Sequence, residues 1–485
     1  MDKEHLALMI FDRIDKFGGR TAMRYHTPAG WKDITWYGLG EQIMGIAKGL
    51  IEAGINEGDR IGIYAPNCPE WHLADFAIAA VGAVSVPVFS GYSTEQLEYI
   101  VNRAGIKLLF VGDEERYDRA MTFYLSSDYL QRVIIFSGLS ERTTVPQNQS
   151  LADFLEMGRK SKKEKDVRTR LSHASGDDYA SIIYTPGTTG EPKGVILTHA
   201  TFFHQVKSLA KLFPLMETDT SLCYLPLSRA FERTWSYFIL SRGAVNCYCD
   251  DHRRAWEYML DVQPTCMTAP PSFYQKLYAS IKESMNADSP LRQAMYRWAI
   301  DTGEVLARYM LQMRPYTRGL RLRHRLTALI LREKIRLFTG RRVRFLISGG
   351  VALPRKIEEL FYAAGIQIYQ GYGLTESASL VAISSPGNFM FGTAGKPLDQ
   401  CEVRISDQGE ILARGPNMMA GYYKVQATPP TPLTRNDGCG RVTWAFSRTD
   451  SCAISAEKLL EISHLLSNHA FFRDIGKKGG ILDLP

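Results

Sequence analysis

The sequence has 485 residues, of which 45% are hydrophobic and 22% charged, and its formal net charge is +7. This composition is that of a soluble globular protein, and the length predicts two to four structural units. No apolar stretch is long and charge-free enough to span a membrane. The net charge is too small to indicate a nucleic-acid partner, and none is predicted. The eight cysteines are scattered without a zinc-site pattern, so reduced thiols and a location in the cytoplasm, either free or associated with a membrane, are expected.

The first third of the chain alternates helical and strand patterns. The first 20 residues carry acidic side chains inside an amphipathic helix pattern and do not resemble a signal peptide. Helical patterns at 34–55, 70–83 and 94–105 alternate with strand patterns at 59–66, 84–90 and 106–113. Repeated βα units predict a parallel sheet with helices on both faces. The charged stretch 160–170 is expected to lie on the surface and to mark a boundary.

The segment "YTPGTTGEPKGVILTH" at 184–199 is rich in glycine and threonine. The apolar residues before it predict a buried strand, and those after it predict a helix with Thr198 as N-cap. Between strand and helix, glycine N–H groups, hydroxyls and Lys193 are groups that hold phosphate. A plain surface turn is the alternative. A Walker-type P-loop is excluded, because from Gly187 the second required glycine falls on Pro192 and no Lys-Ser or Lys-Thr pair follows.

This loop closely resembles the signature T-S-G-T-T-G-x-P-K-G of the adenylate-forming (AMP-binding) superfamily. The matching residues are Thr185, Gly187, Thr188, Thr189, Gly190, Pro192, Lys193 and Gly194. Pro186 replaces the usual serine and offers neither a hydroxyl nor a backbone N–H. Loss of one phosphate donor costs about 1–3 kcal/mol, so weaker binding rather than no binding is expected.

Four further blocks follow in the family's order, up to residue 424. In "YQGYGLTES" at 369–377, the resemblance implies that Tyr372 stacks on adenine, Thr375 contacts phosphate and Glu376 coordinates Mg²⁺. "FLISGGVALP" at 345–354 is similar to the stretch whose backbone lines the adenine pocket. "GTAGKPL" and "GEILARGPNMMAGYYK" match later blocks. Five blocks in the correct order support the resemblance far more strongly than any one of them.

Two features indicate the long-chain acyl-CoA synthetase branch. "YLPLSRAFERTW" at 224–235 resembles its L-P-L-S-H-x-F-E-R block, which implies acyl-side contacts from Arg229, Phe231 and Trp235; Arg229 replaces the usual histidine. An ordinary packed loop is the alternative. The basic segment 314–344 looks like part of the helical insertion of that branch and is expected either to lie on anionic membrane or to form a solvated face.

The resemblance implies an α/β fold, with two parallel-sheet βα subdomains and a small antiparallel β-barrel-like subdomain. This is the N-terminal domain of the acyl-CoA synthetase and luciferase fold. Residues 1–424 are expected to form the AMP-binding domain, with subdomains at about 1–170, 171–345 and 346–424. Residues 425–485 are expected to be an aberrant tail.

The implied chemistry is the activation of a long-chain fatty acid by ATP to acyl-AMP and then, with CoA, to acyl-CoA. The catalytic candidates are Thr188, Lys193 and Glu376, and Glu376 is also the Mg²⁺ candidate. The ATP-binding candidates are Thr185, Gly187, Thr188, Thr189, Gly190, Lys193, Gly349, Gly350, Val351, Gly371, Tyr372, Gly373 and Thr375.

After "GYYK" the sequence departs from the family. The T-G-D block that holds the ribose, the hinge and the lysine-bearing C-terminal domain are not recognisable in residues 425–485. A frameshift between Lys424 and Arg441 is our hypothesis for this departure, and impaired activity is the expectation. The alternatives are a non-catalytic nucleotide or fatty-acid binding module and an adenylating enzyme of another branch. The F-E-R block and the basic insertion argue against the last.

Overall fold

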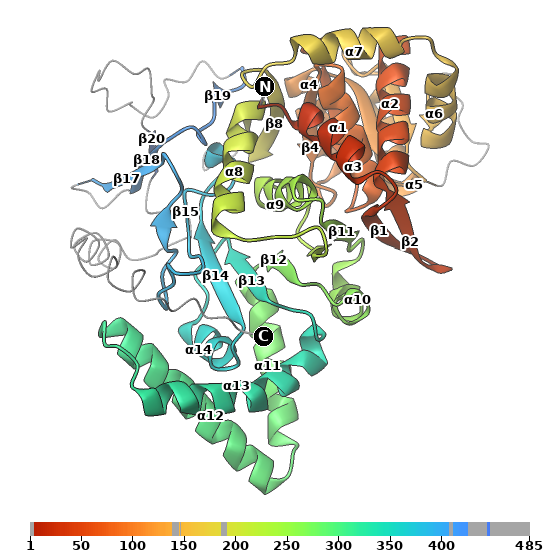
Figure 1. Cartoon of the computed structure of the whole chain (residues 1–485). Helices are drawn as coiled ribbons and strands as arrows, with labels where there is room; N and C mark the ends of the chain where they lie inside the picture. The colour runs from red at the N-terminus through yellow and green to blue at the C-terminus, as the bar shows by residue number, and fades with distance from the viewer. Residues whose placement is uncertain are drawn as a thin grey trace.

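The computed structural model describes residues 4–137, 145, 147–185, 192–406 and 411–424, together with the backbone of 444–446. Within this described part, the strands form two large sheets and one small sheet (Figure 1). The predicted α/β class with parallel sheets is therefore confirmed.

The first large sheet has the described order β19-β9-β8-β4-β3-β5-β6-β7. Its strands are β3 (Arg60–Tyr64), β4 (Val84–Val88), β5 (Ile106–Val111), β6 (Arg132–Ile135), β7 (Gln149–Ser150), β8 (Tyr179–Thr185), β9 (Lys193–Thr198) and β19 (Gly421–Tyr422). All neighbours are parallel except β8 with β9 and β9 with β19.

The second large sheet has the described order β16-β15-β14-β13-β12-β10-β11-β1-β2. Its strands are β1 (Thr21–Thr27), β2 (Gly30–Thr35), β10 (Thr220–Cys223), β11 (Val245–Tyr248), β12 (Cys266–Ala269), β13 (Phe345–Gly349), β14 (Gln367–Tyr372), β15 (Ala382–Ile383) and β16 (Lys396–Pro397). The small antiparallel sheet contains β17 (Glu402–Ile405), β18 (Ile411–Arg414) and β20 (Trp444–Phe446).

The first seven helices precede β8 in the sequence, and α3, α4 and α5 connect consecutive strands of the first sheet. They are α1 (Leu6–Phe17), α2 (Trp36–Glu52), α3 (Pro69–Ala80), α4 (Thr94–Ala104), α5 (Glu114–Tyr124), α6 (Leu151–Lys160) and α7 (Glu164–His173). Local sequence signals set their ends. In α4, Ser93 and Gln96 form a capping box and Gly105 ends the helix in the left-handed conformation.

Helix α8 connects β9 to β10, and the later helices lie in the sequence between strands β10 to β15 of the second sheet. They are α8 (His199–Leu212), α9 (Ala230–Ser241), η1 (His252–Arg254), α10 (Ala255–Val262), α11 (Pro271–Asn286), α12 (Pro290–Leu311), α13 (Arg318–Thr339), α14 (Arg355–Ala363) and η2 (Thr375–Ser377). None of the helices in the described residues is long and apolar enough to cross a membrane.

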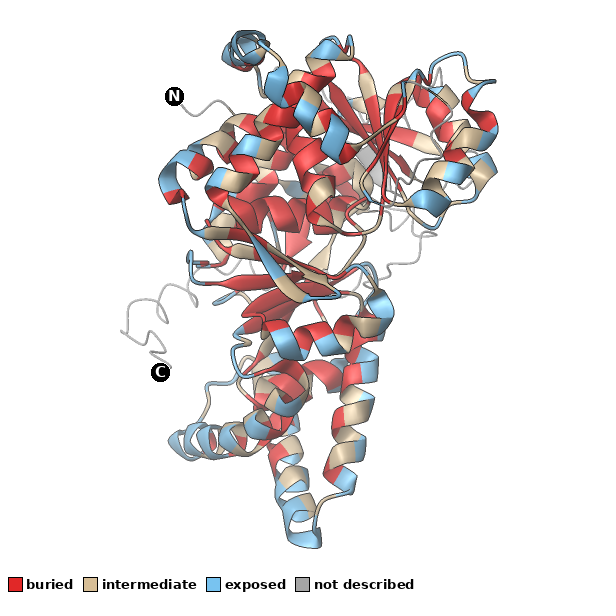
Figure 2. Ribbon diagram, turned by 90° about the vertical axis from the view of Figure 1, so that its right-hand side faces the viewer, coloured by how far each residue is buried: buried red, intermediate tan, exposed pale blue. Residues whose placement is uncertain are grey.

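One apolar core joins the two large sheets. Ile63 of β3, Phe238 of α9 and Ile347 of β13 are all fully buried in it. Helices α8 and α9 occupy the middle of the molecule, with β4 and β8 above them and β13 and β14 below them in Figure 1. The buried residues concentrate in the sheets and these central helices (Figure 2). Both sheets are therefore held by one continuous hydrophobic core, which fixes their edges relative to each other.

The segment after the glycine-rich loop corrects the predicted strand–loop–helix arrangement. Residues 193–198 form strand β9, which returns antiparallel to β8, and the helix begins only at His199. Val195 and Leu197 are fully buried, and the strand is paired on both sides, with β8 and β19. The strand therefore stands between the loop and the predicted helix, where the sequence analysis expected no strand. The predicted N-cap is confirmed, since the Thr198 side chain accepts from Thr201 N.

The sheets do not follow the predicted subdomain boundaries. Strands β1 and β2, from the start of the chain, belong to the second sheet, whereas β8, after the charged stretch 160–170, extends the first sheet by pairing with β4. Most of that charged stretch is helix α7. Strands β13 to β16 also belong to the second sheet, and within the described residues the small antiparallel sheet consists of β17, β18 and β20.

Candidate active site

The β8–β9 hairpin holds the two ends of the glycine-rich loop together. Thr185 and Lys193 are directly paired across the hairpin, and the Thr185 hydroxyl lies 3.5 Å from the Lys193 carbonyl oxygen. The predicted loop residues Pro186, Gly187, Thr188, Thr189 and Gly190 lie outside the described residues, so their roles stay predictions.

A carboxylate, a phenol and an ammonium group meet beside this hairpin. The Tyr422 hydroxyl donates a 3.0 Å hydrogen bond to Oε1 of Glu376, and Lys193 Nζ lies 5.6 Å from the centre of the Tyr422 ring. Strand β19 pairs with β9 and places Tyr422 opposite Val195. Burial, and then the Glu376 charge, raise the pKa of Tyr422, so its hydroxyl keeps the proton that it donates.

The adenine-side candidates lie at the carboxyl ends of β13 and β14. These strands are parallel, and their register pairs Gly349 directly with Gly371. Beyond Gly349 the backbone turns through Gly350, whose φ of +94° suits glycine, to Val351, which is 51% exposed. Tyr372, the last residue of β14, is half-buried. Two strand ends with small residues and one adjacent aromatic ring can accommodate a flat base.

The turn that carries Thr375 and Glu376 requires glycine at position 373. A Cβ added to Gly373 would lie only 1.7 Å from the carbonyl oxygen of Ser379. The chain then forms η2, in which Thr375 and Glu376 are both half-buried. The close backbone approach therefore explains one of the predicted glycines on steric grounds.

Four side-chain hydrogen bonds from outside the turn fix its position. Gln205 Nε2 donates to the carbonyl oxygens of Ser377 and Leu380, at 2.8 and 2.7 Å. Thr234 Oγ1 donates to the Ala378 carbonyl, and Asn417 Nδ2 donates to the Leu380 carbonyl. The sequence analysis missed these positioning residues. Gln205 carries no motif signal, whereas Thr234 and Asn417 lie inside the matched blocks at 224–235 and 409–424, which gave no indication of this positioning role.

The acyl-side candidates separate into two environments. The Phe231 ring lies against Gly349, because a Cβ added there would be 2.6 Å from the ring. The Arg229 guanidinium lies 5.2 Å from the centre of the Phe89 ring, at the end of β4 in the first sheet. Trp235 is only 1% exposed and its Nε1 donates a 2.9 Å hydrogen bond to Ser221. Phe231 and Arg229 therefore lie nearer the strand ends than Trp235, which lies in the core.

A buried ion pair joins α9 to α3. Arg233 pairs with Asp75 of α3, and both side chains are almost fully buried. Arg233 also donates to Tyr237 Oη and to Ser181 Oγ of β8, both at 2.6 Å. The charged pair within the apolar stretch "AFERTW" is the sequence signal for this network, which the motif comparison did not interpret.

The neighbouring Glu232 is a buried carboxyl group. Its Oε2 accepts hydrogen bonds from Thr268 Oγ1 and Leu225 N, and burial raises its pKa to about 8. Glu232 therefore carries a proton at neutral pH in a large fraction of molecules.

The Glu376 carboxylate fits a magnesium ion. The described residues contain no group of three or more His, Cys, Asp or Glu side chains that could hold a metal. Mg²⁺ needs no such group in a nucleotide site, because one or two carboxylates, phosphate oxygens and water complete its shell. Glu376 supplies one hard oxygen ligand, and its hydrogen bond with Tyr422 limits how the carboxylate turns.

Comparisons with known proteins agree with this arrangement of motifs. The sequence profile of the AMP-binding enzyme family matches residues 10–423, and the chain belongs to this family. The long-chain-fatty-acid–CoA ligase FadD15 of Mycobacterium bovis is 29% identical over 437 residues, which cover 89% of this chain and 69% of the relative. The predicted resemblance to the fatty acid–CoA ligase branch is thereby confirmed. Membership of this family implies the use of ATP and CoA.

Two solved structures share the fold. A long-chain-fatty-acid-CoA ligase (FadD1) from Archaeoglobus fulgidus has a TM-score of 0.68 at 19% identity, covering 96% of this chain and 86% of that one. The N-terminal domain of FACL13 from Mycobacterium tuberculosis has a TM-score of 0.63 at 17% identity, covering 92% and 100%. The chain spans 69% of the length of FadD15 and 57% of the length of the peroxisomal long chain acyl-CoA synthetase 7 of Arabidopsis thaliana.

Proposed function

We propose that this chain binds ATP at the ends of β8, β9, β13 and β14 and converts a long-chain fatty acid into an acyl-adenylate. The meeting of Lys193, Tyr422 and Glu376 carries the proposal. The Lys193 ammonium group lies beside the Tyr422 ring, and the Glu376 carboxylate accepts a hydrogen bond from the Tyr422 hydroxyl. Together they form a site that can bind a polyphosphate and its counter-ion.

Each part of the site has a role in the proposed adenylation. A fatty-acid carboxylate oxygen attacks the α-phosphorus of ATP, a P–O bond forms, and the bond to the bridging oxygen breaks to release pyrophosphate. Lys193 and the glycine-rich loop neutralise the phosphate charge, and Tyr422 holds the Glu376 carboxylate in place. Mg²⁺, when bound, supplies Lewis-acid neutralisation of the phosphate oxygens. Tyr372 and the Gly349–Gly371 pair provide the adenine surface.

The acyl substrate is proposed to enter beside Phe231 and Arg229, with Trp235 contributing from the core. A long aliphatic acid is the best-supported substrate class, because the curated relative named above is a long-chain-fatty-acid–CoA ligase. CoA is the proposed acceptor: its thiol attacks the acyl carbonyl, AMP leaves, and the thiol proton passes to solvent. We also propose the AMP-binding domain limits at residues 1–424 and peripheral contact between the 314–344 segment and anionic membrane.

A second candidate is a binding module that retains ATP or fatty acid without turnover. The absence of a recognisable ribose-binding T-G-D block in residues 425–485 favours it. An adenylating enzyme needs the ribose fixed as well as the phosphates, since nucleophile and α-phosphorus must be aligned.

A single-turnover assay separates these two functions. The purified full chain would be mixed with ATP, Mg²⁺ and oleate, and acyl-AMP would be measured by mass spectrometry. Formation of oleoyl-AMP, absent with Glu376→Ala, supports adenylation. ATP binding without oleoyl-AMP supports the binding module. Absence of both contradicts the proposed nucleotide site.

A further inference from the structure

An asparagine of the first sheet holds the loop that leads into α9. Asn67 lies in the connection between β3 and α3 and is only 5% exposed. Its Nδ2 donates hydrogen bonds to the carbonyl oxygens of Cys223 and Leu225, at 3.1 and 2.8 Å. Its Oδ1 accepts a 3.0 Å hydrogen bond from Leu227 N. One buried carboxamide therefore binds three backbone groups of the segment that ends β10 and follows it.

These bonds require an amide at position 67. They use both N–H groups and the carbonyl oxygen of the Asn67 side chain. An aspartate has the same size and keeps an acceptor, but as an anion it has no proton to donate to the two carbonyl oxygens. An aliphatic side chain would leave buried backbone groups without partners. The contact is therefore specific to the donor and acceptor pattern of asparagine.

The same loop is also held by Glu232 of α9. Glu232 Oε2 accepts a 3.1 Å hydrogen bond from Leu225 N and a 2.8 Å hydrogen bond from Thr268 Oγ1 of β12. Both backbone polar groups of Leu225 are thus bonded to side chains, the N–H group to Glu232 and the carbonyl group to Asn67. Since Asn67 follows a strand of the first sheet and Thr268 lies in the second, the loop is fixed against both sheets.

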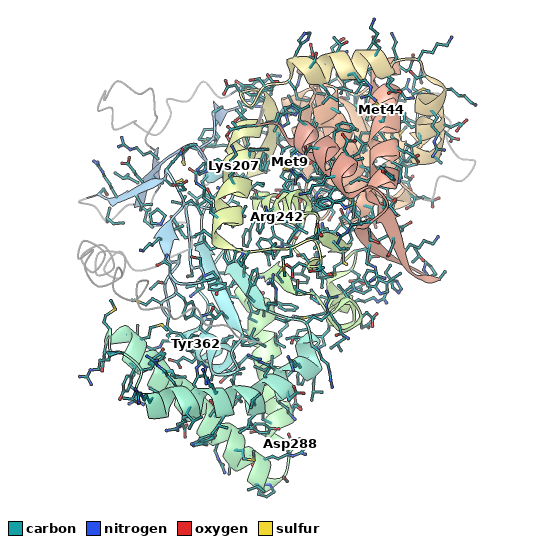
Figure 3. The ribbon with its side chains drawn as sticks, viewed as in Figure 1. Met9, Met44, Lys207, Arg242, Asp288 and Tyr362 are labelled. Carbon is teal, nitrogen blue, oxygen red and sulfur yellow. The ribbon has the colours of Figure 1, made fainter. Side chains whose placement is uncertain are left out.

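This loop carries or precedes two candidate acyl-side residues. Arg229 closes its last turn, because Arg229 N donates to the Pro226 carbonyl oxygen at 2.9 Å, and its guanidinium lies over the Phe89 ring. Phe231 follows in the first turn of α9. Figure 3 labels Arg242, the residue directly after α9, near the middle of the molecule. The places of Arg229 and Phe231 in the molecule therefore depend on the path of residues 224–229.

We propose that Asn67 is a positioning residue for the acyl substrate: by fixing residues 224–229, it sets where Arg229 and Phe231 meet the fatty acid. The inference rests on the proposed function, because the acyl-side roles of these two residues belong to it. Both N–H groups of Asn67 are already bonded to the loop, so Asn67 acts through the loop and not by donating to the substrate. None of its three bonds goes to a candidate ATP-binding residue, so its loss should affect the fatty acid and not ATP.

Binding of the fluorescent fatty acid cis-parinarate to the full chain tests this proposal. In Asn67→Ala, the Kd for cis-parinarate should rise about tenfold, because the loop loses its three hydrogen bonds. The Kd for ATP should stay within about twofold of that of the unmodified chain, since ATP shares none of these bonds. Asn67→Asp keeps the size and the acceptor but loses both donors, and should weaken cis-parinarate binding as well. Hydrogen–deuterium exchange of peptides within 223–229 should be faster in both variants.

The matched control is Asn148→Ala. Asn148 is 4% exposed, its Oδ1 accepts a 2.8 Å hydrogen bond from Val133 N, and its Nδ2 donates to Tyr117 Oη. This variant removes an equally buried amide from the β6–β7 side of the first sheet, and should leave both Kd values unchanged. Equal weakening of cis-parinarate binding by the control would overturn the proposal. Equal loss of both ligands in the Asn67 variants, or unchanged fatty-acid binding or exchange in them, would do so too.

Failure of the inference is distinguishable from failure of the proposed function. If the unmodified chain binds no cis-parinarate, the proposed acyl site is contradicted and the inference falls with it. If the unmodified chain binds cis-parinarate and the Asn67 variants bind it equally well, only the inference is overturned. Circular dichroism confirms that each variant is folded. A further measurement needs no variant: cis-parinarate should slow exchange within 223–229 of the unmodified chain, and a lack of this protection would overturn the proposal.

Discussion

The Tyr422 hydroxyl donates a 3.0 Å hydrogen bond to the Glu376 carboxylate, and so joins two motifs that lie 46 residues apart. Tyr422 belongs to the edge strand β19, whereas Glu376 lies in the turn after β14 of the other large sheet. This bond therefore links the two sheets at the candidate phosphate site. The carboxylate that is proposed to hold Mg²⁺ depends on both sheets for its position.

Removing the Tyr422 hydroxyl should weaken Mg²⁺-dependent ATP binding. Hydrogen bonds to charged groups contribute about 1.5–3 kcal/mol, so Tyr422→Phe is expected to raise the Kd for ATP about tenfold in the presence of Mg²⁺. Isothermal titration calorimetry at several Mg²⁺ concentrations measures this change. Tyr423→Phe is the matched control, because the Tyr423 hydroxyl contacts the Ala104 carbonyl instead. Equal effects of the two variants would contradict the assigned role.

Adding a methyl group at Gly373 should disrupt the turn that carries Glu376. The new Cβ would lie 1.7 Å from the Ser379 carbonyl oxygen, so the backbone must move. Gly373→Ala is expected to lower the free energy of unfolding by about 3 kcal/mol, measured by urea denaturation. Gly19→Ala is the control, since a Cβ there meets no atom within 4 Å. Similar stability of the two variants would show that the close approach is not required.

Breaking the buried Asp75–Arg233 pair should be strongly destabilising. Leaving one buried charge without its partner costs about 3–5 kcal/mol, so Arg233→Met should lower the free energy of unfolding by that amount. Asp75→Leu/Arg233→Met should recover part of the loss, because no lone charge remains. Denaturation of the single and double variants measures this coupling. As a control, Arg168→Gln breaks an exposed pair with Glu164 and should cost less than about 1 kcal/mol.

The buried Glu232 should make stability depend on pH. Burial raises its pKa from 4.5 to about 8, so the folded chain binds this proton more tightly than the unfolded chain. The resulting stabilisation is fully present below pH 4.5 and is lost as the pH rises through about 8. Glu232→Gln mimics the neutral acid and should lose less stability than the unmodified chain between pH 5 and pH 8. Glu164→Gln changes an exposed site, so its stability should vary with pH as that of the unmodified chain does. If the stability of Glu232→Gln varied with pH in the same way as that of the unmodified chain, the raised pKa of Glu232 would be contradicted.

Local signals predicted much of the fold. The periodic helices α2 and α4, the strands β3 to β5 and the Thr198 N-cap all form where the sequence predicts them, because their patterns and caps are local. Two of the motif blocks also lie side by side in the structure, since Gly349 of β13 pairs directly with Gly371 of β14. Short motifs at strand ends meet in this way because parallel strands share one carboxyl edge.

The rest depends on pairing between distant segments. The membership of β1 and β2 in the second sheet rests on the contact of β1 with β11, more than 200 residues away, and no local pattern encodes that choice. Strand β9 was not predicted, because three apolar residues between the loop and the helix cap are too short a pattern to indicate a strand. Tyr422 was part of a recognised block, yet its partner Glu376 could be identified only once β19 was placed beside β9.

Fatty-acid-dependent ATP–pyrophosphate exchange is the most direct test of the central claim, that the Lys193–Tyr422–Glu376 site adenylates a fatty acid. The full chain would be assayed with oleate, Mg²⁺ and ATP beside the variants Glu376→Ala and Lys193→Gln. The account predicts oleate-dependent exchange by the unmodified chain and its loss in both variants. Exchange that is absent from the unmodified chain while ATP still binds, or that is unchanged in Glu376→Ala, would contradict it.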